Sequence, residues 1–398
     1  MDLRQIFLRN VAQTSDEPLA LELTKAEGVY LYDKNNRPYL DLISGIAVSN
    51  VGHRHPKVTA AIKEQVDKYL HQMVYGEYLQ SPQILLAQGL AKTLEKYNSP
   101  QGQKLDNVYF TNSGTEAVEG ALKLAKRFTG RPEIISCYQA YHGSTHGALS
   151  LGDEEFKRSY RPLLPDIRKI RRNEVADLEM ISTKTAAVII EPIGGENGVL
   201  AADLTYLRKL VNRCKEVGAL VIFDEVQSGF GRTGAFWAFE HYGFAPDILL
   251  TAKGMGGGMP IGAFIASKEM MSVFKENPIL GHITTFGGHP VSCAASLATL
   301  NVIQDEIKHS ETLEKELLFK KLLQHPKIKE VRGKGLMLCA EMENFEFLKK
   351  TIDKTIANGV ITDWFLYCDN AMRIAPPLTI TNKEIEFACG VILAALED

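Results

Sequence analysis

The chain has 398 residues, of which 45% are hydrophobic and 23% are charged, and its formal net charge is −3. This composition is ordinary for a globular protein, and the length suits two or three domains or one large α/β domain with an appendage. The near balance of charge, without a dense run of Lys and Arg, argues against a nucleic-acid partner. No apolar run approaches a membrane span, and residues 1–18 lack the apolar core of a signal peptide.

The cysteines are scattered along the chain without a Cys-x-x-Cys pair. This spacing is not typical of a metal knuckle or a disulfide framework, so we expect no metal site. Reduced cysteines are typical of a cytoplasmic protein. The positions are Cys137, Cys214, Cys293, Cys339, Cys368 and Cys389.

The predicted elements begin with a hairpin and two helices. In YLYDKNNRPYLDL, residues 30–42, a polar centre between alternating apolar flanks predicts a β-hairpin. Apolar residues at helical spacing predict helices over 56–70 and 82–97. Short apolar strands then alternate with helices. The predicted strands are 108–110, 133–137, 186–192, 220–224, 247–253 and 262–267, and the predicted helices among them are 112–128 and 204–217.

This alternation predicts an α/β fold class with a mostly parallel central sheet and helices on both faces. From Val291 to Leu323 the pattern predicts a long helical stretch. Strand candidates at 331–342 and 371–378 follow that stretch. We therefore expect a second, smaller α+β domain at the C-terminal end, joined by the N-terminal hairpin.

Polar groups stand at the ends of several predicted strands. They are Asn112–Thr115, Glu191, Asp224 with Gln227, and Lys253. Ligands of open α/β sheets bind outside the carboxyl ends of the strands. If the strands are neighbours, these groups converge on one site.

The segment Asn112–Glu116 follows a strand and opens a helix. Its backbone N–H groups and the hydroxyls of Ser113 and Thr115, at the positive end of a helix, suit a phosphate. The same residues also fit a helix N-cap with a capping box, which needs no ligand. This segment has neither the GxxxxGK(S/T) pattern of a P-loop nor the GxGxxG pattern of a dinucleotide fold, and both interpretations stay open on this motif alone.

Lys253 and Asp224 suggest a more specific chemistry. A lysine that follows a buried strand is desolvated, which lowers its pKa and favours Schiff-base formation, although a surface loop lysine gives the same pattern. A carboxylate that ends an apolar strand needs a cationic partner. A lysine, an acid for a pyridinium nitrogen and a phosphate site are together typical of pyridoxal phosphate (PLP). A metal would need more ligands than the pair Asp224 and Glu225 offers.

Eight motifs occur along the chain in an order that is typical of one enzyme family. The chain resembles the class III, or ω-, aminotransferases, and within them the acetylornithine and ornithine aminotransferase group. The resemblance covers nearly the whole chain from about residue 52 onward and rests on the motifs in combination. They are SGTEAVEGALKLAKR, YHGSTHGAL, EPIGGENG, DEVQSGFGRTG, TAKGMGGGMPIGA, TTFGGHP, VRGKGLM and MRIAPPLTIT.

The family implies a fold-type I PLP enzyme that works as a homodimer with active sites shared at the interface. Together with the pattern of elements, it divides the chain into three parts. We expect an N-terminal segment over 1–50 that packs with the small domain, a large PLP-binding domain over 51–294, and a small C-terminal domain over 295–398.

The resemblance also assigns residues to the cofactor. Lys253 matches the Schiff-base lysine, and Asp224 matches the partner of the pyridine nitrogen. Thr285 matches a phosphate ligand contributed by the partner subunit. The other expected contacts are Gln227 near the ring hydroxyl, Val226 and Tyr141 on the two ring faces, Ser113, Gly114 and Thr115 at the phosphate, and His142 and Glu191 near the ring.

Three residues are expected to bind substrate. Arg373 matches the arginine that receives the α-carboxylate of glutamate or 2-oxoglutarate, which a guanidinium binds bidentately. Glu196 matches the glutamate that pairs with this arginine while an ω-amine occupies the site; without the family, the two would read as a surface ion pair. We expect Tyr78 to be a further substrate contact. The resemblance thus implies transfer of an amino group from an ω-amine, such as ornithine, acylated ornithine or 4-aminobutyrate, to 2-oxoglutarate, giving glutamate.

The chain departs from the family in the segment 141–145. In the acetylornithine and ornithine group this segment usually reads aromatic-His-Gly-Arg-Thr, whereas this chain has Ser144 in place of the arginine. That arginine would hold the donor's carboxylate, so either another cation replaces it or the donor is of another kind. His289 also stands where the family often has Asn. The candidate replacement cations are Arg158, Arg161, Arg171 and Arg172.

Three other classes of protein share part of this pattern. A PLP-dependent aminomutase or racemase on the same fold would share Lys253 and Asp224 but would not need the pair of Glu196 and Arg373. A non-enzymatic PLP-binding protein would not need to keep Lys253 or Asp224, and both are present. A Rossmann dehydrogenase would need a GxGxxG motif after a strand. Formation of glutamate from 2-oxoglutarate distinguishes transamination from isomerisation.

Overall fold

The structure is a computed structural model that describes residues 2–16 and 18–397. Its central sheet has the strand order β4-β10-β9-β8-β7-β5-β6, and the antiparallel strand β10 lies between β4 and β9. The neighbours from β9 to β6 pair in parallel, as the sequence predicts. The strands are β4 (Asn107–Thr111), β5 (Glu133–Cys137), β6 (Ile167–Ile170), β7 (Thr185–Ile190), β8 (Leu220–Asp224), β9 (Ile248–Thr251) and β10 (Gly262–Ala266).

Both faces of the central sheet are buried. Successive apolar side chains point to opposite faces, so Ile189 belongs to one buried cluster and Val188 to the other. Helix α5 (Gly114–Thr129) covers the first face, where a Cβ at Gly120 would lie 2.2 Å from a ring carbon of Phe264 on β10. Helix α8 (Leu204–Val217) packs against β8. This explains why the strands read as continuous apolar runs.

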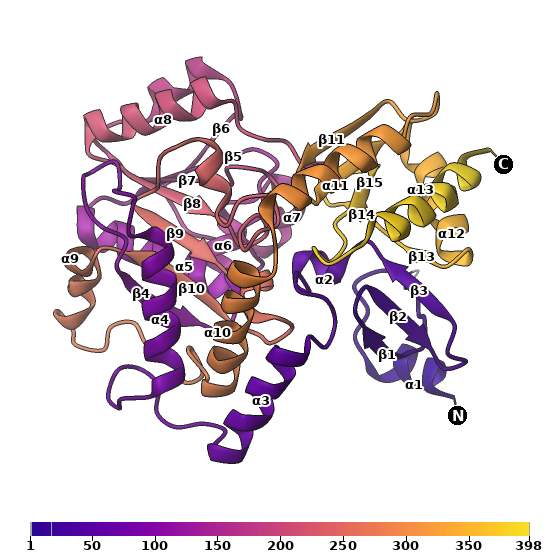
Figure 1. The fold of residues 1–398 in the computed structure, drawn as a ribbon. Helices are drawn as coiled ribbons and strands as arrows, with labels where there is room; N and C mark the ends of the chain where they lie inside the picture. Colours follow the sequence, from indigo (N-terminus) through magenta and orange to yellow (C-terminus); the bar gives the residue numbers. More distant parts are fainter. Residues whose placement is uncertain (1, 17, 398) are drawn as a thin grey trace.

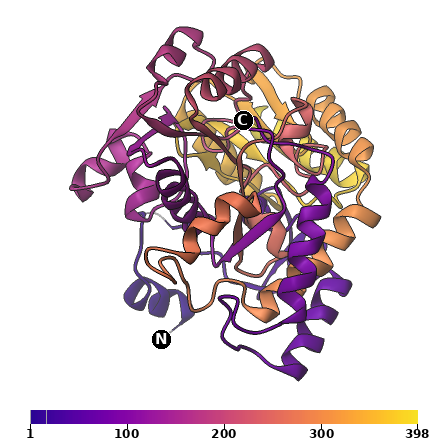
Figure 2. The same cartoon turned by 90° about the vertical axis from the view of Figure 1, so that its left-hand side faces the viewer.

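Helices α3 (Pro56–Lys68) and α4 (Ser81–Leu94) confirm the two helices predicted early in the chain. Both pack against α10 (Pro290–Asp305), so segments far apart in sequence lie side by side (Figures 1 and 2). The single long helical stretch predicted from Val291 to Leu323 is wrong. α10 ends at Asp305 and α11 (His309–Leu322) begins after a turn in which Ile307 packs against the core. Neither glycine nor proline marks that turn in the sequence.

The C-terminal part of the chain builds an antiparallel sheet of its own, in the order β11-β12-β15-β14. Helix α12 packs against β15, and α11 packs against β11. Helix α13 packs on both α11 and α12. The elements are β11 (Glu330–Lys334), β12 (Met337–Glu341), α12 (Phe345–Ala357), β14 (Trp364–Phe365), β15 (Cys368–Ile374) and α13 (Asn382–Glu397).

The N-terminal strands form a third sheet, in the order β1-β2-β3-β13. Strands β2 (Tyr30–Asp33) and β3 (Pro38–Asp41) form the predicted hairpin, and β1 (Leu23–Glu27) pairs with β2. The partner of β3 on its other edge is β13 (Val360–Ile361), which runs parallel to it. Figure 1 shows the indigo strands beside the yellow end of the chain. The predicted boundary between 294 and 295 falls inside α10, and the three-part division stays a prediction.

Short helices connect these elements. None of the helices in the described residues has the length and apolar character needed to cross a membrane. The short α-helices are α1 (Leu3–Asn10), α2 (Ser44–Ala47), α6 (His146–Ser150), α7 (Glu154–Lys157) and α9 (Lys268–Met271). The 3₁₀ helices are η1 (Arg158–Tyr160), η2 (Val175–Met180), η3 (Ala238–His241), η4 (Lys253–Gly256) and η5 (Ser272–Lys275).

Candidate active site

A cavity of about 520 Å³ opens where the loops leave β4, β5, β7, β8 and β9. The sheet therefore brings together the polar strand ends that the sequence singled out. Arg373 lies directly behind the wall of this cavity, bonded to a lining residue. Of the expected site residues, the cavity is lined by Ser113, Gly114, Thr115, Tyr141, His142, Glu191, Glu196, Asp224, Val226, Gln227 and Lys253.

The two carboxylates at the end of β8 point in different directions. Asp224 lines the cavity, where its Oδ2 lies 2.7 Å from Nδ1 of His142 and its Oδ1 accepts the N–H of Val226 at 3.0 Å. Glu225 is fully buried and accepts backbone N–H groups, including that of Phe239 at 2.7 Å. Burial raises the pKa of Glu225 to about 8. Only Asp224 is therefore available to a ligand.

Lys253 begins η4, directly after β9, and its side chain is accessible only in part, from the cavity. Its φ of 44° lies in the left-handed region, which is strained for a residue with a side chain. Desolvation by the surrounding protein lowers the pKa of Lys253, and the charge of Glu196 opposes that shift. A lysine with a lowered pKa provides a neutral, nucleophilic amine at a lower pH than a surface lysine.

The N-terminus of α5 opens on the same cavity. Ser113 caps the helix by accepting the N–H of Glu116 at 3.3 Å, and Oε2 of Glu116 accepts the N–H of Asn112 at 2.7 Å. The capping interpretation is thus correct, and it leaves the positive helix end facing the cavity. Gly143 lies against this end, since a Cβ there would be 2.2 Å from Oγ1 of Thr115.

These groups fit PLP. A carboxylate, an amine of lowered pKa and a helix N-terminus suit the ring nitrogen, the aldehyde carbon and the phosphate of that cofactor. Gly114 lies so close to Val226 that a Cβ would come within 2.8 Å of its Cγ1, which leaves no room for a larger residue in this cradle. Tyr141 and Val226 both line the cavity and can contact the faces of a planar ring.

Arg373 and Glu196 form a buried, bidentate ion pair. Arg373, on β15, is 3% exposed and donates to the two carboxylate oxygens of Glu196 at 3.1 and 3.0 Å. Its Nε also donates to Asp363 at 2.7 Å, a partner that the sequence did not indicate. Burial opposes the charge of Glu196, but Arg373, Lys253 and Gln227 together outweigh it and lower the pKa of Glu196. The pair is therefore ionised and is not a surface pair.

Glu196 connects Arg373 to the cavity. Its Oε1 also accepts from Nε2 of Gln227 at 3.2 Å, and its Oε2 accepts the N–H of Leu366 at 3.2 Å. Its backbone carbonyl accepts the N–H of Tyr367 at 2.9 Å. A ligand that drew Arg373 away from Glu196 would thus act on the cavity wall and on the turn at residues 366–367.

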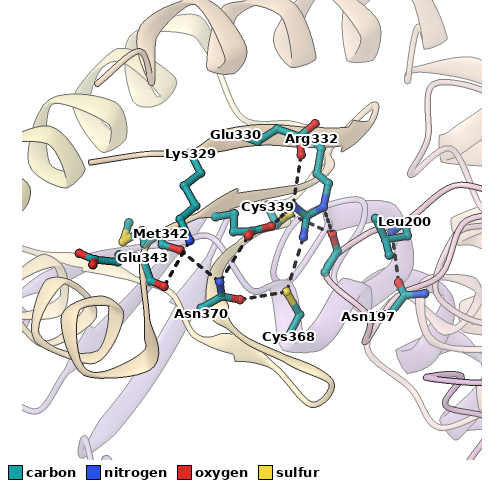
Figure 3. Close-up of polar contacts among 12 residues, drawn as sticks. Asn197, Leu200, Lys329, Glu330, Arg332, Cys339, Met342, Glu343, Cys368 and Asn370 are labelled. Atoms are coloured by element: carbon teal, nitrogen blue, oxygen red, sulfur yellow. Dashed lines mark hydrogen bonds and ion pairs between the residues drawn. The ribbon is translucent and has the colours of Figure 1, made fainter. Parts of the chain in front are cut away.

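The loop that carries Glu196 is anchored to the C-terminal sheet (Figure 3). The carbonyl of Gly198 accepts from Nε of Arg332 at 2.7 Å and from Sγ of Cys339 at 3.0 Å, and Arg332 also pairs with Glu341. Gly198 has a φ of 73°, and a Cβ there would lie 2.5 Å from Nη2 of Arg332. This anchor fixes the position of the loop that carries Glu196 relative to the C-terminal sheet.

Ser144 lies beside Tyr141, with 3.2 Å between the two hydroxyl oxygens. None of the four arginines considered as replacements lines the cavity. Arg161 forms an ion pair with Glu154, and Arg171 forms one with Asp177. Arg172 donates to the backbone carbonyl of Glu191, and Arg158 is exposed.

Two expected contacts lie away from the cavity in this chain. Tyr78 is 55% exposed on the loop between α3 and α4, and its role stays a prediction. Thr285 is exposed, and its carbonyl bonds to the ring of His71 at 2.9 Å. Its expected contact is with the cofactor of a partner subunit, which also stays a prediction. The ring of His289 stacks on His71 at 5.6 Å.

The fold and the site together define a fold-type I PLP-dependent enzyme. A family model described as aminotransferase class-III matches residues 11–396, and the chain belongs to this family of PLP-dependent aminotransferases.

Similar proteins agree with this membership. The acetylornithine aminotransferase of Methanocaldococcus jannaschii is 38% identical over 383 residues, which cover 92% of this chain and 91% of the relative. That of Methanopyrus kandleri is 38% identical over 400 residues, covering 100% and 99%. A structure of Toxoplasma gondii ornithine aminotransferase, with partial occupancy of PLP, superposes with a TM-score of 0.90 at 28% identity, covering 99% and 93%. The chain is thus an acetylornithine/ornithine aminotransferase-like enzyme of class III.

Proposed function

We propose that this aminotransferase binds PLP in the cavity and moves an amino group from an ω-amine to 2-oxoglutarate, giving glutamate. The observation that carries the proposal is the buried pair of Arg373 and Glu196 at the cavity wall. The carbon that bears the reacting amine of an ω-amine donor carries no carboxylate, whereas the reacting carbon of glutamate or 2-oxoglutarate does. An enzyme that uses both needs a guanidinium that is neutralised in the first half-reaction and free in the second. Glu196 provides the neutralising group.

Lys253 and Asp224 would carry the chemistry at the cofactor. PLP, when bound, supplies the electron sink that accepts the electron pair left by proton removal from the substrate carbon. The amine of Lys253 would remove that proton as general base and return one as general acid, a task suited to its lowered pKa. Asp224, held by His142 and the N–H of Val226, would keep a proton on the ring nitrogen.

Arg373 would bind the α-carboxylate of 2-oxoglutarate or glutamate after Glu196 turns away. Its planar fork matches a carboxylate bidentately, as it now matches Glu196. Asp363 would keep the guanidinium in place during the exchange, because its bond to Nε does not compete with the substrate. The proposal includes a cytoplasmic homodimer in which Thr285 of the partner subunit completes the phosphate site.

The proposal is tested by following glutamate formation from 2-oxoglutarate with a panel of ω-amines. The wild type, Lys253→Ala and Lys92→Ala are compared after reconstitution with PLP, since Lys92 is an exposed helix lysine. We expect Lys253→Ala to lose at least about 100-fold in rate and Lys92→Ala to retain the wild-type rate. Retained transamination in Lys253→Ala would overturn the assignment. Consumption of amine without any glutamate would indicate an isomerase.

A further inference from the structure

A second pocket, of about 700 Å³, adjoins the cavity. The two share the segment from Tyr141 to Ser144, so the loop after β5 forms a common wall. The second pocket therefore lies beside the cavity, against the same loop segment that ends at Ser144. We call it the distal pocket.

The distal pocket is lined mainly by aromatic and aliphatic side chains. Phe156 and Tyr367 pack edge to face with 5.1 Å between ring centroids, and Leu149, Tyr160 and Leu366 add to the apolar lining. Among the described residues that line it, there is no lysine, arginine, aspartate or glutamate. The lining histidines are His142, which is bonded to Asp224, and His146.

Some charged side chains near the distal pocket are paired with one another. Lys169 binds Asp153 at 2.8 Å, and Arg161 binds Glu154 at 2.6 Å. The described residues that line the pocket thus offer neither a Lys or Arg for a carboxylate nor an Asp or Glu for an ammonium group. Moving an unpaired charge out of water into such surroundings is costly, whereas aromatic walls favour an apolar group.

The distal pocket is also tied to the pair of Arg373 and Glu196. The N–H groups of Leu366 and Tyr367, two residues of its wall, donate to the carboxylate and the carbonyl of Glu196. While Glu196 neutralises Arg373, this wall is held in place. The distal pocket therefore keeps this wall in the half-reaction during which Glu196 stays paired with Arg373.

We propose that the distal pocket receives the far end of the amine donor and that this end is an uncharged alkyl or aromatic group. The inference rests on the proposed function and narrows it to primary amines without a distal carboxylate or ammonium. Ser144 supports this selection, because its hydroxyl is held by Tyr141 and brings no charge to the common wall.

The test uses the PLP-loaded enzyme without any keto acid and follows the loss of the visible absorption of the cofactor. Three five-carbon amines differ only at the far end: 1-aminopentane, 5-aminopentanoate and 1,5-diaminopentane. Glutamate is the reference for the Arg373 site. We expect the apparent second-order rate constant of 1-aminopentane to exceed those of the other two amines by about tenfold or more.

The outcomes separate the two proposals. If glutamate reacts and either charged amine matches or exceeds 1-aminopentane, the inference is refuted and the proposed function stands. If neither glutamate nor any amine reacts, the proposed function fails, and the inference fails with it.

A substitution at the common wall gives an independent readout. Ser144→Arg places a cation beside the distal pocket, and we expect it to raise the rate ratio of 5-aminopentanoate to 1-aminopentane by about tenfold or more. Ser272→Arg adds the same charge at an exposed position after α9 and serves as the control. Equal ratios in the two variants, with the cofactor absorption of both intact, would overturn the inference.

Discussion

Removing the charge of Glu196 should change the affinity of Arg373 for a dicarboxylate. In Glu196→Gln the amide keeps the shape of the side chain but loses its charge and one of the two charge-assisted bonds, which now measure 3.1 and 3.0 Å. A hydrogen bond to a charged group contributes about 1.5–3 kcal/mol. Because an incoming dicarboxylate no longer displaces a carboxylate, we expect glutamate to bind about 10- to 150-fold more tightly.

The assay is the half-reaction, followed by the change in cofactor absorption as a function of glutamate concentration. The same variant should react more slowly with an ω-amine, because the charge of Arg373 is then not neutralised toward the cavity. Asp363→Asn is the matched control, since Asp363 pairs with Nε of the same guanidinium but does not line the cavity. Glutamate binding that is unchanged or weaker in Glu196→Gln, or equally tightened in both variants, would refute the reasoning.

The remaining predictions concern stability, measured by urea unfolding. Gly198→Ala should lower the free energy of unfolding by about 1–3 kcal/mol, because φ is 73° and Arg332 fills the space for a Cβ. Gly390 lies in α13, and a Cβ there would have nothing within 4 Å, so Gly390→Ala should raise the free energy of unfolding by about 0.5–1 kcal/mol. A Gly198→Ala variant more stable than Gly390→Ala would contradict both predictions. Burial, with help from Lys123, lowers the pKa of His282 from 6.5 to about 4. The unfolded chain therefore takes up that proton first as the pH falls, so stability should decline from pH 6.5 toward 4, and His282→Gln should flatten the decline.

The sequence predicted that Asp224 and Lys253 meet at one cavity, because local rules determine their positions. Asp224 and Lys253 each follow a run of buried apolar residues, and parallel strands bring their carboxyl ends to one edge. The phosphate end was ambiguous on sequence alone, since a helix cap and an anion site use the same residues. The structure has the cap and the open helix end together.

Other features depend on contacts that no local pattern encodes. Asp363 reaches Arg373 through the antiparallel pairing of β14 with β15, and nothing near Asp363 in sequence indicates that partner. Strand β6 was missed because it is a short edge strand in which Arg168 and Lys169 stand between two isoleucines. The turn after Asp305 is likewise set by packing of Ile307 against the core, not by a helix-breaking residue.

The parallel pairing of β3 with β13 has a consequence for synthesis on the ribosome. Arg37, just before β3, donates to the carbonyl of Ala357, and 320 residues separate the two. At about 5–20 residues per second, translation of that interval takes roughly 16 to 64 s. Throughout this time the nascent chain carries a hairpin whose outer edge has no partner of its own. An unpaired edge can recruit strands of other chains, so the N-terminal sheet is exposed to misassembly until β13 has been made.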